Sequence, residues 1–188
     1  MKRTILMLIV LLTTVWSWAQ IITSTPSIAI QTSGVNDSIV IIYDASLGGT
    51  TAGLKGYTGT VYAHTGVTYG GTKWQKAPTW GSNLDKYKLT RPNPTTEPNK
   101  WKFVIKPNIN QYYGLTGSEI VTQLCFVFRS GEIPTGKTAF LEGKDNGADI
   151  FMDVKQPGLN VAFTNPTIDQ AVLPGTFMTI GVSSSLAA

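Results

Sequence analysis

The chain has 188 residues, of which 42% are hydrophobic and 14% charged, with 15 basic and 11 acidic side chains. The charges form no block of one sign, which argues against nucleic-acid binding. The single cysteine, Cys125, excludes an internal disulfide bond. Its place in the apolar string LCFVF predicts a buried, unreactive thiol.

The N-terminus has the layout of a secretory signal peptide. Lys2 and Arg3 precede an apolar run over 5–15, and Ser17 and Ala19 are small residues at the positions that specify cleavage. The run is too short to span a bilayer core of about 30 Å, and no later segment is long enough. We therefore expect cleavage after Ala19 and a protein that is secreted or at the cell surface, with no membrane span in the mature chain. Removal of the signal leaves 13 basic residues against 11 acidic ones.

Strand patterns dominate the rest of the chain. They occur at 38–44, 59–67, 86–90, 100–106, 123–129 and 148–154. The segment 100–106 alternates and places Trp101 on an apolar face, whereas 123–129 is apolar on both faces, as in a central strand. Segments rich in Gly, Pro and Asn separate the strands. This pattern predicts an all-β, immunoglobulin-like sandwich over 20–155, with one helical turn at 108–113.

The C-terminal segment repeats a rhythm seen earlier in the chain. Residues 26–46 and 165–185 both have an entry marked by proline, a polar turn and an alternating apolar strand. Residues 156–188 cannot close a core alone, because a β-sandwich needs roughly a hundred residues. We expect a linker and the truncated start of a second immunoglobulin-like domain. The alternative is a terminal strand that returns to the first sandwich.

The string GEIPTGKT at 131–138 satisfies the phosphate-loop pattern G-x-x-x-x-G-K-[ST]. A phosphate loop requires a helix that begins at the Lys-Thr pair. The following sequence, AFLEGKDNGADI, contains Gly143 and Gly147 and lacks an apolar stripe of helical period. We therefore interpret the string as a surface loop with Lys137 in water, and we expect no nucleotide binding.

The polar residues do not form a recognisable catalytic or metal site. His64 is the only histidine, and no carboxylate or serine stands at a triad position, so a packed or edge residue is expected. Asp145, Asn146 and Asp149 could supply oxygen ligands to calcium, but their spacing departs from the calcium-loop pattern. We predict no catalytic residue, no metal ligand and no required cofactor.

The aromatic residues are more informative. Five of them fall between positions 57 and 80: Tyr57, Tyr62, Tyr69, Trp74 and Trp80. Sugar rings stack on exposed aromatic faces, so Trp and Tyr in glycine-rich loops are candidates for glycan contact. Sandwich cores also contain such residues. The two tryptophans lie in or beside turn-rich segments, and we expect them to be the more exposed.

Five strings together resemble a known family. They are GLKGYTGTVYAHTGV, LDKYKLT, WKFVIKPNINQYYG, VTQLCFVFRS and GKDNGADIFMDV. They are similar to the N-terminal β-sandwich module of secreted α-amylase-like glycoside hydrolases of family 13 from Bacteroidetes, over roughly Ser38 to Val154. The resemblance implies that another immunoglobulin-like segment and a catalytic barrel follow. The catalytic carboxylates of that family belong to the barrel, and no stretch of this chain matches their motifs.

We therefore expect a non-catalytic module of a starch-type glycoside hydrolase. Its expected partners are α-glucan or another polysaccharide and the downstream domains of the same polypeptide. The main alternative is a cell-surface or adhesion sandwich that binds a protein partner. A third hypothesis, an enzyme in its own right, lacks a visible acid–base pair or nucleophile.

Overall fold

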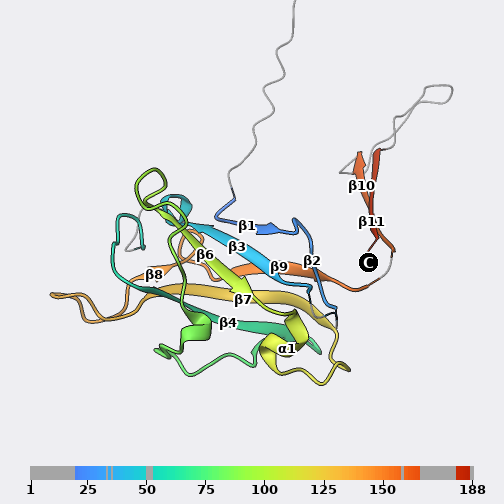
Figure 1. Ribbon diagram of the computed structural model, residues 1–188, viewed down its shortest axis with the longest axis horizontal. Coiled ribbons are helices and arrows are strands. Elements are labelled where there is room, and N and C mark those ends of the chain that lie inside the picture. The colour runs from blue at the N-terminus through green and yellow to red at the C-terminus, as the bar shows by residue number, and fades with distance from the viewer. Residues whose placement is uncertain are drawn as a thin grey trace, which may run out of the picture.

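The computed structural model describes residues 20–157, except 33, 35 and 50–52, and the backbone of 159–165 and 181–186. The predicted signal peptide lies outside the described residues. The described chain is an all-β sandwich, as predicted (Figure 1). Its strands are β1 (Ile22–Thr25), β2 (Ala29–Ile30), β3 (Ile39–Asp44), β4 (Val61–Tyr69), β5 (Thr72–Gln75), β6 (Lys100–Ile105), β7 (Val121–Ser130), β8 (Glu142–Gly143) and β9 (Ile150–Lys155).

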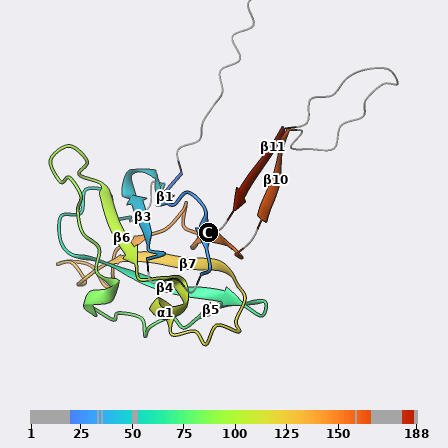
Figure 2. The same cartoon turned by 45° about the vertical axis from the view of Figure 1, so that its right-hand side comes forward.

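The strands form two facing sheets. The smaller sheet has the order β1-β3-β6, and the larger has the order β2-β9-β7-β4-β5, with β8 also paired to β7. These pairings are antiparallel, except that β2 runs parallel to β9. Figures 1 and 2 show β3 and β6 lying over β4 and β7, so the core occupies the space between the two sheets.

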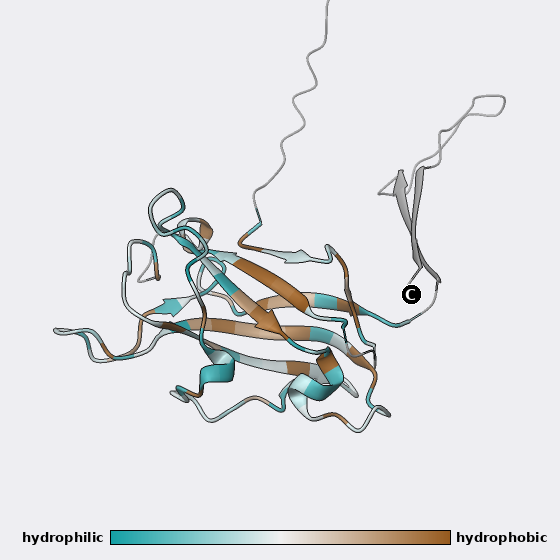
Figure 3. Ribbon diagram, viewed as in Figure 1, coloured by the Kyte–Doolittle hydropathy of each residue, from teal (hydrophilic) through white to brown (hydrophobic). Residues whose placement is uncertain are grey.

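In the small sheet, buried residues alternate with half-buried ones, because successive side chains of a strand point to opposite faces. In β3, Ile39, Ile41 and Tyr43 are buried, and in β6 Trp101 and Phe103 are buried. The intervening residues are only half-buried. Both strands carry apolar residues along their length (Figure 3). The sequence prediction for these two strands, including the core position of Trp101, is confirmed.

The large sheet is centred on β4 and β7, which pair from Val61↔Ser130 to Tyr69↔Val121. From Leu124 to Ser130, β7 is buried on both faces, as expected of a central strand. Cys125 is a buried free thiol, as predicted. Burial on both faces means that other parts of the chain cover the outer face of this sheet.

Three short segments of the described chain are helical. The strand expected at 86–90 is wrong, because Asp85–Tyr87 is a 3-10 helix and the chain then makes only isolated bridges, Lys88 to Tyr62 and Thr90 to Lys102. The expected apolar face is nevertheless correct, since Tyr87 and Leu89 are buried.

The helical turn expected near position 108 is confirmed as α1 (Ile109–Tyr113). The Asn108 side chain caps it by accepting a hydrogen bond from the amide of Gln111 at 2.8 Å. Another 3-10 helix covers Ala45–Leu47.

The GEIPTGKT string forms a loop between β7 and β8, as interpreted from the sequence. A turn closes it, with the amide of Lys137 donating to the carbonyl of Pro134 at 2.9 Å. Lys137 is exposed, and no helix follows the string before β9 in this described stretch. The backbone arrangement of a phosphate loop is therefore absent from these residues.

The C-terminal part contributes β10 (Leu159–Asn165) and β11 (Gly181–Leu186), which pair with each other as an antiparallel hairpin. The structure does not test whether they begin a second sandwich, so that division stays a prediction. Among the described residues, no helix combines the length and apolar character that crossing a membrane requires.

After β5 the chain turns back over the outer face of β4. We call residues 74–83, which include the last two residues of β5, the strap. The strap crosses β4 at Gly66, where an added Cβ would lie 2.8 Å from the carbonyl oxygen of Gln75 and 3.1 Å from the Cβ of Ala77. Glycine at this position therefore allows the close approach of the strap to the sheet.

We predict that Gly66→Ala destabilises the protein by about 1–3 kcal/mol, because the added methyl group forces the strap away from β4. Urea unfolding measures this change in the free energy of unfolding. Thr58→Ala, at an exposed loop residue, is the control and is expected to stay within about 0.5 kcal/mol of the wild type. Wild-type stability of Gly66→Ala would contradict the close crossing.

Candidate functional site

The outer face of the large sheet carries a cluster of rings, which we call the aromatic platform. It consists of His64, Trp74, Trp80, Phe140 and Phe151. His64 is at the centre, with its ring centroid 5.2 Å from that of Trp74 and 4.8 Å from that of Trp80. Phe151 and Phe140 extend the cluster on its two sides, each with its centroid 6.3 Å from the neighbouring indole.

The platform is partly open to solvent. Trp80 is 43% exposed, which is unusual for so large an apolar side chain, and Trp74 and His64 are half-buried. Lys73 lies over the ring of Phe151, with its Nζ 4.0 Å from the centroid. The platform therefore presents aromatic faces with a polar border.

A buried arginine anchors the platform. Arg129, on β7, is only 1% exposed, and its guanidinium donates hydrogen bonds to the carbonyl of Ser82 and to Oδ1 of Asn83 at 2.9 Å. It also lies over the rings of Tyr62 and Phe140, 5.4 and 4.8 Å from their centroids. Arg129 thus holds both the strap that carries Trp80 and the loop that carries Phe140.

The environment of His64 favours its neutral form. Burial lowers the pKa of His64 from its usual value, and the nearby charge of Arg129 lowers it further. Asp149 acts in the opposite direction and raises the pKa. A neutral imidazole can stack on an indole without bringing an uncompensated charge into the cluster.

The structure brings the two predicted tryptophans together through their common contact with His64, but it does not bring the three predicted tyrosines to the same surface. Tyr57 and Tyr69 pack partly buried against the core. Tyr62 is 9% exposed and lies beneath Arg129, where it supports the platform from within the sheet.

The polar side chains of the loop considered for calcium interact with one another and with Glu142. Asn146 donates a hydrogen bond to Asp145 at 2.9 Å, and Lys144 forms ion pairs with Glu142 at 2.8 Å and with Asp149 at 3.5 Å. Within the described ranges, no three His, Cys, Asp or Glu side chains are grouped as a metal site would require.

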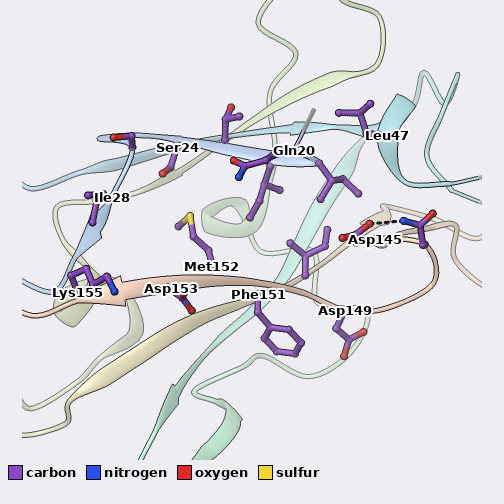
Figure 4. Close-up of a pocket in the computed structure, with 16 residues that line it drawn as sticks. Gln20, Ser24, Ile28, Leu47, Asp145, Asp149, Phe151, Met152, Asp153 and Lys155 are labelled. Carbon is purple, nitrogen blue, oxygen red and sulfur yellow. Dashed lines mark hydrogen bonds between the residues drawn. The ribbon is translucent and has the colours of Figure 1, made fainter. Parts of the chain in front are cut away.

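A hollow of about 990 Å³ lies between β1 and β9, next to the platform. Figure 4 shows Met152 pointing from β9 towards β1, whereas Phe151 points to the opposite side. The hollow is lined by aliphatic and polar side chains, and Phe151 is its one residue shared with the platform. Neither indole of the platform lines this hollow.

Sequence reasoning missed several members of the platform. Alternation along β4 could have placed His64 on the same outward face as Tyr62, because they are two residues apart. No local sequence pattern marks Phe140 and Phe151 as members of the platform. Their contacts with the tryptophans depend on the loop after β7 and on the pairing of β9 with β7.

No protein-family model matches the chain, and no curated protein matches it in sequence.

We predict that His64 titrates at a lower pH than an exposed histidine, and that its neighbours move its pKa in opposite directions. Arg129→Met removes a cation and raises the pKa of His64, whereas Asp149→Asn removes an anion and lowers it. NMR titration of this single histidine measures both shifts. Lys137→Gln, at an exposed loop residue, is the charge control and leaves the pKa unchanged. A pKa of wild-type His64 at or above about 6.5 would contradict the environment described.

The lowered pKa of His64 makes the free energy of unfolding depend on pH. Because the pKa of His64 is lower in the folded state, the unfolded chain binds more protons once the pH falls below about 6.5. The contribution to stability is complete above that pH and declines as the pH falls towards the folded-state pKa. We predict that His64→Phe, which keeps an aromatic ring, removes this part of the pH dependence in urea unfolding between pH 7.5 and about pH 5. An unchanged pH profile would show that another group is responsible.

Proposed function

We propose that this chain is a non-catalytic carbohydrate-binding module from the N-terminal end of a secreted, α-glucan-active glycoside hydrolase. The observation that supports binding best is the platform in which Trp74 and Trp80 meet on His64, with Trp80 open to solvent. The similarity to family 13 modules supports the class of parent enzyme.

The chemistry of the platform suits a sugar ring. The axial C–H groups of a pyranose form an apolar surface that stacks on an indole, and the hydroxyl groups at its edge require polar partners. Lys73 lies at the border of the platform, where its ammonium can donate hydrogen bonds to such hydroxyl groups. A surface with aromatic faces and a thin polar border matches a neutral sugar better than a charged one.

The angle between the indoles favours a curved glycan. The ring of His64 is inclined by 29° to Trp74 and by 73° to Trp80, so the two indole planes differ by at least the difference of these angles, about 44°. Stacking along a flat, extended β-1,4 chain needs nearly coplanar rings. An α-1,4 chain turns from each sugar to the next and can follow two inclined rings.

A non-catalytic module is useful when it is joined to an enzyme. Binding to the same polymer would raise the effective concentration of the substrate at the linked catalytic domain. The proposed partners are therefore an α-glucan and the downstream domains of the same polypeptide. A (β/α)-barrel pattern in the reading frame after Ala188 would support this part of the proposal, and its absence from the full-length protein would contradict it.

We predict that Trp80→Ala weakens binding to maltooligosaccharides by about 3- to 10-fold, because one stacking face is lost. Isothermal titration calorimetry measures the dissociation constant, and affinity electrophoresis in amylose tests the polymer. Trp80 is the cleaner variant because it is exposed, whereas Trp74 is half-buried and its removal also disturbs packing.

Leu84→Ala is the matched control, because Leu84 is 59% exposed and contributes no ring to the platform. It should bind as the wild type does. Cello-oligosaccharides test the angle argument and should bind more weakly than maltooligosaccharides. If neither sugar is bound by the wild-type protein, carbohydrate binding at the platform is refuted.

A further inference from the structure

A second surface, on the small-sheet side of the sandwich, is rich in lysine. It is a groove of about 540 Å³ between β6, the segment 85–90 and α1. Four lysines line it: Lys86, Lys88, Lys102 and Lys106. We call it the lysine groove.

The backbone register places the lysines on this surface. Thr90 and Lys102 form an antiparallel bridge with amide-to-carbonyl distances of 2.9 and 2.7 Å. The alternate residues Leu89 and Phe103 are buried in the core, so the lysines on either side point outwards. Two short lysine-bearing segments thus lie side by side and face the same way.

The positive charge of the groove is not neutralised locally. Asp85 is the one carboxylate in its lining. Within the part of the chain that the structure describes, the ion pairs are made by Lys100 and Lys144, and none of the four groove lysines forms one. Like charges so close together repel one another.

Part of the groove is held in place before any ligand arrives. Lys86 donates a hydrogen bond to the carbonyl of Tyr112 at 3.3 Å, and the Tyr112 hydroxyl donates to the carbonyl of Lys86 at 2.6 Å. The Lys86 ammonium also lies over the rings of Tyr87 and Tyr112, 4.9 and 5.0 Å from their centroids. The bridge between Thr90 and Lys102 pairs the edge of β6 at one position only. The lysines point from the face of the sheet and not along its edge, so protection of a free edge does not account for them.

From these observations we propose that the lysine groove binds an anionic polysaccharide through its sulfate or carboxylate groups. A lysine ammonium is a compact point charge with three donors, so it attracts sulfate or carboxylate without requiring a fixed bidentate geometry. Thr90 and Gln111, at the walls, are available for the sugar hydroxyl groups. The lining contains no arginine, and Tyr87 and Tyr112 are buried in the core, so the stacking surface that single-stranded nucleic acids use is missing. The groove is separate from the aromatic platform, and this proposal does not depend on the function proposed there.

Binding is tested with dextran sulfate, polygalacturonate and neutral dextran, each applied to the mature protein in calorimetry at low ionic strength. We predict that one or both anionic polymers bind, that neutral dextran does not bind at the groove, and that added salt weakens the binding. The two anionic polymers distinguish sulfate from carboxylate recognition.

The decisive variant is Lys88→Glu combined with Lys106→Glu, because both side chains are exposed and their replacement should not disturb the core. We expect at least about a tenfold loss of affinity for the anionic polymer. The control is Lys55→Glu combined with Lys137→Glu, which has the same net charge with both changes at exposed positions outside the groove. It should stay within about threefold of the wild type.

Equal losses in the two double variants would show that only net charge matters and would overturn the proposal. Absence of polyanion binding by the wild-type protein would also overturn it. Thermal unfolding of Lys88→Gln combined with Lys106→Gln provides an independent measurement. Release of the repulsion should leave this variant at least as stable as the wild type, whereas a clear loss of stability would assign the lysines a structural role.

Discussion

The antiparallel pairing of β4 with β7 is the contact on which the rest of the structure depends. It places His64 opposite Val127, Gly66 opposite Cys125 and Tyr62 opposite Arg129, all on the outer face of the large sheet. The opposite faces of both strands fill the core. Because the outward residues Cys125 and Val127 are apolar and buried as well, this face needs a cover, and the strap supplies it at the point where Gly66 allows contact.

Arg129 explains why the cover has a defined position. A guanidinium taken out of water loses favourable solvation, and this cost is offset only when its donors find acceptors. Here the acceptors are the carbonyls of Ser82 and Ser130 and the side chain of Asn83. Moving the strap would leave this buried charge with fewer partners, so the same hydrogen bonds that satisfy Arg129 fix the exposed indole of Trp80 in place.

Local sequence patterns predicted the sandwich well and the site only in part. The strands β3, β6 and β7 followed from alternation or from an apolar run, because each signal is contained within one segment. The segment 86–90 had the right apolar face but a 3-10 helix in place of a strand, since no regular ladder forms there. The platform depends on register between distant segments, which is why Trp74 and Trp80 could be named from the sequence but Phe140 and Phe151 could not.

Backbone strain in the strap helps to decide between two roles for the platform, a cover for the sheet and a surface for a ligand. Trp74 and Lys76 have φ angles of 63° and 59°, in the left-handed region, where a non-glycine residue costs roughly 1–2 kcal/mol. The chain uses glycine for this conformation at Gly70, Gly71 and Gly81 nearby. A bulky indole at position 74 therefore adds a conformational cost that glycine would avoid. Stacking on His64 offsets part of it, but a cover alone needs neither this strain nor the exposed ring of Trp80. The ligand site proposed above would account for both the strain at Trp74 and the exposure of Trp80.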